Sequence, residues 1–476
     1  MVIIIGAGIA GLSAAISLRK AGYSVKVIYE TLFNSSYYSK GGIAAARSPD
    51  DSPELHKLDT ISVCEELCDP KVVDYFTKRA VEVVEELEKL GFKFDKELRL
   101  EGGHSRRRVH SVGDSTGRAL LNFFINKVRE LEIPLIQDRV IKLIVKDAKV
   151  KGILTENHVQ VEDSRVVIAT GGYSSLFSLS TNLNSSYGEG IAIAFREGTL
   201  ISDMEFVQFH PTAAIVNNQV ILITETLRGE GAEVINQNGE RFLFKYHKRG
   251  ELAPRDILAR AIYEEILRGN KVFIDARKVK DVKEKFPDLY NILLKNGINL
   301  LKDLIPIYPA AHYTIGGIRV NYRGESNIYG LYAIGEVSDT GFHGSNRLAS
   351  NSLTECLVQG FSLPLYIDSW EGLYINDGEI YYYTPHYGKD CNLGEIREIN
   401  WRYLGIIRNG SGIKEALNYY HECNTIGNNR SSNAALVSSL LALSALYREE
   451  SRGVHYRSDF PLKSEKFRKR IYFTKY

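Results

Sequence analysis

The fold of this chain is constrained most by two glycine-rich turns that lie near opposite ends of the sequence. The first, GAGIAG at residues 6–11, follows an apolar run at residues 2–5 and precedes a helix-forming segment. The second lies within residues 330–360, where the pattern predicts a strand, a glycine-rich loop and the start of a helix. A turn of the first kind is typical of dinucleotide binding. Because two such turns are expected to meet at one ligand, the sequence favours FAD bound by both segments.

Each part of the first turn has a physical task. Gly6 permits a tight turn, Gly8 lets the backbone approach a pyrophosphate, and Gly11 lets the following helix pack on the strand. The start of that helix faces the phosphates. A second strand at residues 25–29 ends at Glu30, whose carboxylate can accept hydrogen bonds from a ribose. With strand, helix and acidic residue in place, dinucleotide binding is favoured over an ordinary strand-to-helix turn.

Composition favours a soluble globular protein of two or three domains, since 44% of the 476 residues are hydrophobic and 25% are charged. Lys and Arg total 60 against 58 for Asp and Glu, so no bulk charge attracts nucleic acid or an anionic membrane. The apolar segment at residues 433–446 is shorter than the roughly 20 residues that span a bilayer, and predicts a buried helix. The basic tail at residues 463–476 is expected to be a solvated surface.

Cysteine usage indicates the redox state. There are five cysteines, an odd number with no CxxC pair: Cys64, Cys68, Cys356, Cys391 and Cys423. This pattern favours reduced thiols in a cytoplasmic protein over a disulfide framework, and it supports no metal or iron–sulfur site.

The patterns along the chain predict three domains. Helices are expected at residues 71–90, 116–131 and 255–268, and a strand at residues 272–275. The segment in the middle of the chain carries longer loops and no glycine fingerprint, which indicates an inserted cap. The expected domains are an α/β FAD-binding domain at residues 1–203 and 313–372, a capping domain at residues 204–312 and a C-terminal helical domain at residues 373–476.

Six ordered motifs carry a family resemblance. They are GAGIAGL at the start, SKGGIAAA at 39–46, FHPT at 209–212, HYTIGGI at 312–318, HGSNRLASNSLTE at 343–355 and ESRGVHYRSDFP at 450–461. Over nearly its whole length the chain resembles the succinate dehydrogenase and fumarate reductase flavoprotein family. The resemblance implies an FAD-dependent oxidoreductase with a Rossmann-like FAD-binding domain, an inserted α+β capping domain and a C-terminal helical domain.

Two positions separate the members of that family. Ser35 stands where the succinate and membrane-bound fumarate enzymes carry the histidine that binds flavin covalently, so the resemblance implies non-covalent FAD. Glu101, in the segment EGGHS, resembles the corresponding residue of members that oxidise L-aspartate, whereas succinate enzymes usually carry glutamine in that region. A desolvated substrate ammonium needs a carboxylate partner, and Glu101 supplies one. The alternative is a solvated loop glutamate beside the three arginines at residues 106–108.

The resemblance also implies the residues around the substrate. Arginines suit a dicarboxylate because their planar fork pairs bidentately with a carboxylate. Arg255 is expected to transfer a proton through Glu225 and Arg228, although an arginine is a poor acid at its usual pKa and a purely binding role is the alternative. The expected substrate-binding residues are Glu101, His210, Thr224, His312 and Arg347.

The family resemblance also implies which residues contact the cofactor. Glu189 stands where the family commonly has an aspartate, and its longer side chain is still expected to reach the cofactor. Glu336 is expected at the ribityl chain, and the start of the helix near Ser352 at the isoalloxazine. The expected cofactor-binding residues are Gly6, Ala7, Gly8, Ile9, Ala10, Gly11, Glu30, Ser35, Ser36, Tyr37, Tyr38, Ser39, Lys40, Gly41, Gly42, Val140, Ala169, Thr170, Gly171, Glu189, Glu336, Ser352 and Leu353.

The expected reaction is oxidation of L-aspartate to iminoaspartate, with hydride transfer from Cα to flavin N5 and reoxidation of the flavin by O2 or fumarate. The resemblance places this reaction first in de novo NAD biosynthesis through quinolinate, with iminoaspartate handed to quinolinate synthase. Two alternatives are a soluble fumarate reductase or succinate dehydrogenase-type flavoprotein, and a flavoprotein subunit that serves mainly as a docking module for an electron-transfer partner.

Overall fold

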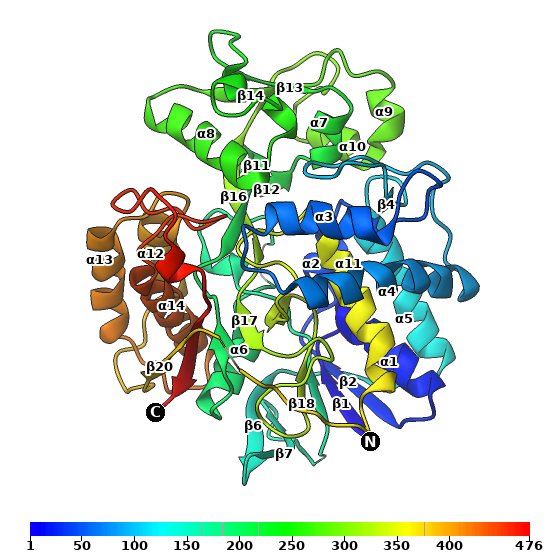
Figure 1. Cartoon of the computed structure of the whole chain (residues 1–476), viewed down its shortest axis with the longest axis vertical. Coiled ribbons are helices and arrows are strands. Elements are labelled where there is room, and N and C mark those ends of the chain that lie inside the picture. The colour runs from blue at the N-terminus through cyan, green and yellow to red at the C-terminus, as the bar shows by residue number, and fades with distance from the viewer. Residues whose placement is uncertain (163, 183–184, 218, 376) are drawn as a thin grey trace.

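The computed structural model describes residues 1–162, 164–182, 185–217, 219–375 and 377–476. Three parts are visible in Figure 1: a central part built on a parallel sheet, a cap at the top and a group of helices at the left. The cap comprises the elements from β11 (Val207–Val216) to β16 (Tyr308–Thr314). The expected fold class, an α/β FAD-binding domain with an inserted α+β cap and a C-terminal helical region, is confirmed.

The central sheet has five parallel strands in the order β18-β9-β1-β2-β5. These strands are β1 (Val2–Ile5), β2 (Val25–Tyr29), β5 (Leu135–Gln137), β9 (Val166–Ile168) and β18 (Leu331–Ala333). Alternate residues of β1 pack into different apolar clusters, Val2 and Ile4 into one and Ile3 and Ile5 into the other. Both faces of β1 are therefore buried, which explains its uninterrupted apolar sequence.

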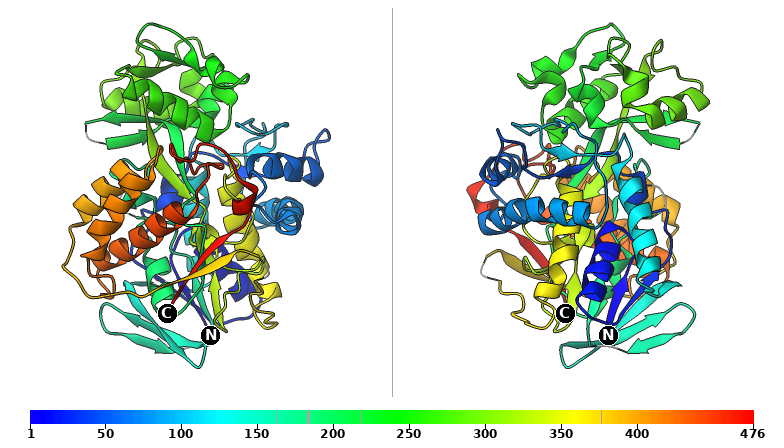
Figure 2. Two further views of the ribbon diagram at one scale, coloured as in Figure 1. Left: turned by 60° about the vertical axis from the view of Figure 1, so that its left-hand side comes forward. Right: turned by 90° about the vertical axis from the view of Figure 1, so that its right-hand side faces the viewer.

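One face of this sheet is covered by three helices from the N-terminal part of the chain and one that follows the second glycine-rich turn (Figure 2). They are α1 (Ile9–Lys20), α4 (Pro70–Lys89), α5 (Thr116–Glu130) and α11 (Asn351–Ser362). The helix expected at residues 71–90 is found as α4: Asp69 caps it by accepting from the backbone N–H groups of Lys71 and Val72, and Pro70 is its first residue. The other face packs against α6 (Glu189–Arg196) and a three-stranded sheet of β6 (Val140–Lys146), β7 (Lys149–Thr155) and β8 (Gln160–Glu162).

The cap has its own apolar core, in which Ile262, Ile274 and Leu293 are fully buried. Its strands form two antiparallel sheets, β12 (Gln219–Leu222) with β11 and β16, and β13 (Glu233–Asn236) with β14 (Val272–Asp275) and β15 (Ile305–Pro306). Its helices are α7 (Glu225–Gly229), α8 (Arg255–Leu267), α9 (Val282–Lys285) and α10 (Pro287–Lys295). The long strands β11 and β16 run from the central part into the cap (Figure 1).

The C-terminal helices are α12 (Leu393–Leu404), α13 (Gly410–His421) and α14 (Arg430–Tyr447). They share one apolar cluster with the central sheet, and α14 packs against α6. The predicted buried helix at residues 433–446 is confirmed within α14, where Leu440 and Leu441 are fully buried. Among the described residues, no helix combines the length and apolar character that a membrane crossing requires.

Several short elements connect these parts. Near the N-terminal turn they are α2 (Ser35–Tyr38), β3 (Ile43–Ala44), α3 (Pro53–Val63) and β4 (Val109–His110). A second five-stranded sheet has the order β19-β17-β10-β21-β20. Its strands are β10 (Ile201–Ser202), β17 (Gly317–Arg319), β19 (Ser338–Asp339), β20 (Glu379–Tyr383) and β21 (Ile471–Lys475).

The prediction of a solvated basic tail holds for its first part, in which Lys463, Lys466 and Arg468 are exposed, and is wrong for the rest. Residues 471–475 form β21, which pairs with β10 and β20, and Tyr472 and Phe473 are buried. Arg470 is buried as well, and its Nη1 contacts Asp203 Oδ2 at 2.6 Å and Asp339 Oδ2 at 2.9 Å. The tail is held because strands distant in sequence supply both hydrogen-bond partners and buried carboxylates, which a local charge count does not reveal.

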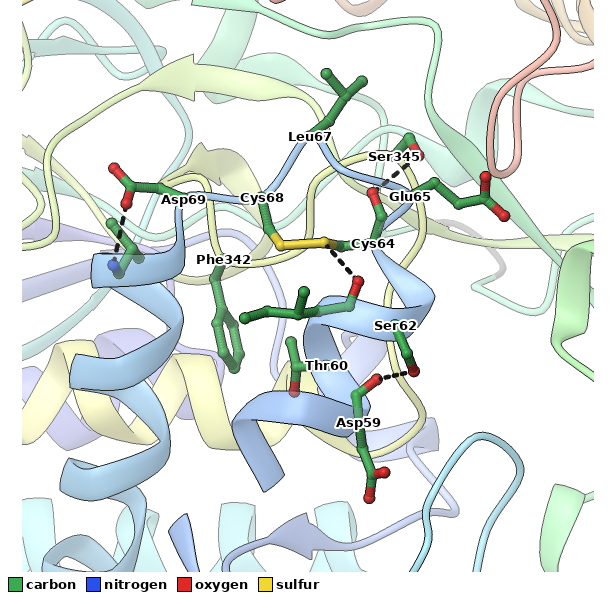
Figure 3. The surroundings of a disulfide bond; sticks show 12 residues. Asp59, Thr60, Ser62, Cys64, Glu65, Leu67, Cys68, Asp69, Phe342 and Ser345 are labelled. Carbon is green, nitrogen blue, oxygen red and sulfur yellow. Dashed lines mark hydrogen bonds between the residues drawn. A yellow bond between two sulfur atoms is a disulfide. The ribbon is translucent and has the colours of Figure 1, made fainter. Parts of the chain in front are cut away.

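The prediction of five free thiols is also wrong. Disulfides join Cys64 to Cys68 and Cys391 to Cys423, and only Cys356 is free. Figure 3 shows the first disulfide at the end of α3, where two residues in left-handed conformation, Glu65 and Glu66, turn the chain back. The second joins the residues that flank α12 and α13, which a backbone bridge between Lys389 and Cys423 brings together.

Removing the Arg470 side chain tests the buried anchoring of β21. We expect Arg470→Ala to lower the free energy of unfolding by about 3 kcal/mol, because it removes the shortest ion pair of both buried carboxylates. Only longer ion pairs remain, from Arg448 to Asp203 at 3.5 Å and from Arg319 to Asp339 at 3.7 Å. The matched control, Arg468→Ala, removes an exposed arginine whose ion pair with Glu465 is worth at most ~1 kcal/mol. Urea denaturation followed by circular dichroism measures both, and equal midpoints for the two variants contradict the buried role.

Candidate active site and cofactor cleft

A cleft opens at the carboxyl ends of β1, β2 and β9, the edge at which parallel α/β sheets bind ligands. The predicted cofactor residues that line it are Gly6, Ala7, Gly8, Ile9, Ala10, Glu30, Ser35, Ser36, Val140, Ala169, Thr170, Gly171, Glu189 and Glu336. They come from segments far apart in the chain, so both glycine-rich turns meet at one site, as predicted.

The glycines of the first turn fit a dinucleotide. Gly6 has φ +114°, and a Cβ added there would lie 2.2 Å from the carbonyl oxygen of Ala169. A Cβ at Gly11 would lie 2.0 Å from the Gly6 carbonyl oxygen, so Gly11 serves the contact between helix and strand and does not line the cleft. Thr170 Oγ1 in the cleft wall is buried and has no hydrogen-bond partner among the described residues. An unpaired buried hydroxyl in the cleft wall, near the first turn of α6, fits a polar ligand such as FAD.

Glu336, from the second glycine-rich segment, also lines the cleft. Its Oε1 accepts from the Thr314 backbone N–H at 3.0 Å and from the Thr314 hydroxyl at 3.2 Å. Burial raises the pKa of the Glu336 carboxyl to about 7, although the hydrogen bonds from Thr314 oppose the shift. Ser35 Oγ, where a covalent flavin linkage would need histidine, hydrogen-bonds to Ser186 Oγ at 2.7 Å.

A second, smaller cavity lies between the central part and the cap. Its wall is made of Ser39, Lys40, Gly41, Gly42, Glu101, His210, Leu222, Thr224, Glu225, Arg255, His312, Arg347, Ser350 and Ser352. All five predicted substrate residues therefore meet, together with Arg255 and Glu225. Ser39 to Gly42 and Ser352, predicted as cofactor contacts, border this cavity and not the dinucleotide cleft.

Some predicted residues lie at neither cavity. Arg228 is buried behind Glu225, with its Nη2 3.8 Å from Glu225 Oε2. Tyr37 packs its ring against the guanidinium of Arg118, with 4.9 Å from Cζ to the ring centroid, and Tyr38 is exposed. Leu353 is buried in the apolar cluster under the sheet. Because α2 is a single short turn, Tyr37 and Tyr38 point away from the cleft that Ser35 and Ser36 line.

Two arginines of the cavity are held by one glutamine. Gln208 Oε1 accepts from Arg255 Nη1 at 3.2 Å and from Arg347 Nη2 at 2.9 Å. The amide of Gln208 in turn donates to the carbonyl oxygen of Arg347 at 2.9 Å. Sequence reasoning missed Gln208, although it directly precedes the FHPT motif; it does not line the cavity itself but contacts the two arginines that do. Burial, followed by the charge of Arg255, lowers the pKa of Arg347 to about 10, so Arg347 stays charged at neutral pH. The cavity wall therefore concentrates positive charge.

Two neutral histidines complete this wall. His210 and His312 lie with ring centroids 5.1 Å apart, and Thr181 Oγ1 is 2.7 Å from His312 Nδ1. Burial, followed by the charge of Arg255, holds the pKa of both imidazoles well below the usual range. At neutral pH the two rings are therefore uncharged hydrogen-bonding groups beside the arginines.

Glu101 is a buried carboxylate in the same cavity, only 3% exposed. Ser350 Oγ donates to its Oε2 at 2.6 Å, and Thr226 Oγ1 donates to its Oε1 at 3.4 Å. Burial and the neighbouring charge of Glu225 raise the pKa of Glu101. The alternative of a solvated loop glutamate is wrong, and Arg108 turns away from Glu101 to pair with Asp51 and Asp59.

Glu225 joins the cap to the central part. Its Oε2 accepts from Arg255 Nε at 2.6 Å, and its Oε1 accepts from the Gly102 backbone N–H at 2.9 Å. A Cβ at position 102 would lie 2.1 Å from Glu225 Oε1, so the approach requires glycine. Burial alone would raise the pKa of Glu225, but Arg255 and Arg228 outweigh it and hold the pKa below its usual value.

A buried polar cluster fixes Arg347 from behind. Its guanidinium lies over the Tyr313 ring, 4.3 Å from Cζ to the centroid. The Tyr313 hydroxyl donates to Glu355 Oε2 at 3.0 Å, and His343 Nε2 contacts the same oxygen at 2.9 Å. Sequence reasoning did not single these residues out, although Tyr313 lies in the HYTIGGI motif and Glu355 ends the HGSNRLASNSLTE motif. The cluster restricts where Arg347 can point.

Comparisons with known proteins agree with this geometry. Residues 1–353 match the family model described as FAD binding domain, and residues 424–475 match fumarate reductase flavoprotein C-term. The chain is 53% identical to L-aspartate oxidase of Saccharolobus solfataricus, over 99% of each chain. It is 38% identical to L-aspartate oxidase of Pyrococcus horikoshii, over 99% of this chain and 98% of the relative.

Among solved structures, a mutant of the E. coli quinol fumarate reductase subunit FrdA superposes with a TM-score of 0.86. It is 27% identical, and the match covers 98% of this chain and 92% of that one. The chain therefore belongs to the L-aspartate oxidase family of FAD-dependent oxidoreductases.

Proposed function

We propose that this chain oxidises L-aspartate to iminoaspartate, using non-covalently bound FAD. The observation that carries the proposal is the charge pattern of the small cavity: two arginines, two neutral histidines and two buried carboxylates, of which Glu225 is paired with Arg255 and Glu101 faces the cavity. This pattern matches a ligand with two carboxylates and one ammonium. Ser35 offers no imidazole for a covalent flavin bond, which supports dissociable FAD.

The cationic side of the cavity fits the substrate carboxylates. Arg255 and Arg347 are already oriented by Gln208, so little side-chain freedom is lost when an anion binds. Guanidinium groups pair bidentately with carboxylates, and His210, His312 and Thr224 can add neutral hydrogen bonds. These groups alone would accept any small dicarboxylate.

Glu101 supports the preference for an amino acid. With succinate bound, its carboxylate would face a methylene group and remain buried without a cation, which costs free energy. With L-aspartate bound, the ammonium supplies that cation. The raised pKa of Glu101, caused by burial and by Glu225, is the signature of a carboxylate that lacks its positive partner.

When bound, FAD supplies the acceptor for the hydride that leaves the substrate Cα. The chain's own contribution is to hold both carboxylates still and to exclude water. Arg255 is the proposed catalytic residue, with Glu225 and Arg228 behind it, because Glu225 Oε2 lies 2.6 Å from Arg255 and 3.8 Å from Arg228. This contiguous chain of groups supports proton movement to or from the cavity, and a purely anion-binding role of Arg255 is the alternative.

Fumarate reduction is the second candidate function. It is favoured by the two arginines and two neutral histidines, which fit fumarate as well as aspartate. Fumarate or O2 is thus proposed to reoxidise the cofactor. The product imine hydrolyses in water, so we further propose that it passes to a consuming enzyme, quinolinate synthase, in the cytoplasm as the first step of NAD biosynthesis.

We propose that the chain has three domains: an FAD-binding domain at residues 1–203 and 313–372, a capping domain at residues 204–312 and a helical domain at residues 373–476. The capping domain is proposed to move as a lid over the cavity. The hydrogen bond from Gly102 to Glu225 and the contacts of Gln208 with Arg347 support a closed position in which the cavity is complete.

The Glu101→Gln variant tests the ammonium role. We expect kcat/KM for L-aspartate to fall at least about 100-fold, because loss of a buried charge pair costs roughly 3 kcal/mol. Fumarate reduction by the same variant should stay within about threefold of wild type. Glu97→Gln, at an exposed position of the same loop region, is the matched control and should leave both activities unchanged. Equal losses of both activities in Glu101→Gln would refute the assignment.

The pH profile gives a second test. Binding of the ammonium needs ionised Glu101, so kcat/KM for L-aspartate should be maximal above the pKa of Glu101 and decline as pH falls through it. Because burial raises that pKa, the decline should occur above the value of about 4.3 for a free glutamate. Steady-state kinetics at constant ionic strength measures the profile. An acid decline that is unchanged in Glu101→Gln would contradict the role of Glu101.

A further inference from the structure

Arg430 is the first residue of α14, in the C-terminal helical region, yet its side chain lines the dinucleotide cleft of the central part. Its position is fixed locally, because Asn429 caps the helix by accepting from the Ser432 backbone N–H at 2.8 Å. None of the sequence motifs includes Arg430. A residue from a different part of the fold therefore completes the wall of the cofactor cleft.

The guanidinium of Arg430 forms ion pairs with carboxylates from two different segments of the cleft wall. It forms ion pairs with Glu30, at the end of β2, and with Glu189, the first residue of α6, where Nε lies 3.3 Å from Oε1. It also lies over the Tyr187 ring, 4.9 Å from Cζ to the centroid. Glu30 and Glu189 are both predicted cofactor contacts, so one arginine holds two carboxylates that face the cleft.

A second arginine strengthens the same junction. Arg139, also in the cleft wall, has its Nη2 3.1 Å from Glu189 Oε1 and donates to the carbonyl oxygen of Asn428 at 2.9 Å. The segment just before α14 is thus bound to the cleft through its backbone as well as through Arg430.

The docking of α14 on α6 determines where Arg430 lies. At the far end of α6, Arg196 donates to the carbonyl oxygen of Thr425 at 3.1 and 3.0 Å and to Asn433 Oδ1 at 2.6 Å. At the near end, a Cβ added to Gly188 would lie 3.0 Å from both methyl groups of Val437. Both ends of α6 are therefore packed on the C-terminal helices, and Arg430 enters the cleft as a consequence.

We propose that Arg430 is an FAD-binding residue contributed by the C-terminal helices. Its positive charge offsets Glu30 and Glu189, which would otherwise repel the anionic pyrophosphate that enters the same cleft. Its contact with Glu30 also holds that carboxylate at the end of β2, where it can accept from a ribose hydroxyl. Because Arg430 is carried by α14, FAD binding and docking of α14 on α6 stabilise each other.

The test compares FAD release from full-length holoprotein of wild type and Arg430→Gln. Release is followed by the rise of flavin fluorescence after dilution, and the dissociation constant is measured by titrating FAD into the apoprotein. We expect the variant to bind FAD at least about 10-fold more weakly, and Arg430→Lys to lie between the two, because lysine keeps the charge but not the planar fork. Arg402→Gln is the matched control, since Arg402 is exposed on α12 and contacts the ring of Tyr403.

Two further readouts separate a cofactor role from a fault in folding. The rise in melting temperature on adding FAD should shrink in Arg430→Gln and stay as in wild type for Arg402→Gln. In the double variant Glu30→Gln/Arg430→Gln, the loss of FAD affinity should be clearly smaller than the product of the two single losses, because the residues act through one contact.

FAD affinity within twofold of wild type in Arg430→Gln would overturn the proposal. Tighter binding would overturn it too, since it would mean that Arg430 competes with the cofactor for Glu30. Independent losses in the double variant would refute the coupling to Glu30. None of these measurements depends on which substrate the holoenzyme oxidises, so a failure here is distinguishable from a failure of the proposed function.

Discussion

Within the small cavity, the carboxylate of Glu225 receives Arg255 from its own cap and the Gly102 N–H from the central part. All partners are buried, so these contacts act in a medium that screens charge poorly. Gln208 then carries the orientation of Arg255 across to Arg347. Arg255 and Arg347 are consequently both oriented toward the anion site only when the cap contacts the central part. Loss of Glu225 would leave Arg255 a buried cation without a carboxylate partner, held only by Gln208, and would remove the contact between Gly102 and the cap.

The proposed preference of this cavity for L-aspartate rests on a balance of charges. Arg255 and Arg347 attract anions of any kind, and His210 and His312 add no charge because burial lowers their pKa. Glu101 is the exception, a carboxylate that burial and Glu225 make costly to ionise. A substrate ammonium removes that cost, whereas a methylene group does not. Specificity in this account is therefore a matter of one unpaired charge and not of cavity shape.

Local sequence was sufficient for features whose contacts lie within one motif. The tight turn at Gly6 and the helix at residues 71–90, found as α4, follow from short-range patterns and were predicted correctly. His210 and Arg347 were predicted to lie together because the motifs that contain them resemble those of one family, and both line the cavity.

Features that depend on contacts between segments far apart in the sequence could not be predicted from local patterns. Gln208 acquires its role only because two arginines from different segments converge on it, and Arg430 enters the cleft only because α14 docks on α6. The burial of β21 and the Cys391–Cys423 disulfide likewise require partners that are distant in sequence. The Cys64–Cys68 disulfide spans only four residues and was missed because the odd number of cysteines favoured reduced thiols. Tyr37 and Tyr38 show the opposite error, since proximity in sequence to Ser36 did not bring their side chains to the cofactor cleft.

The most direct test of the central claim is an anaerobic titration of the FAD-loaded protein with L-aspartate, followed through the visible absorbance of the flavin. The account predicts that L-aspartate bleaches the flavin, and that succinate at the same concentration does not, because only L-aspartate supplies a cation to Glu101. Bleaching by succinate without bleaching by L-aspartate would contradict it.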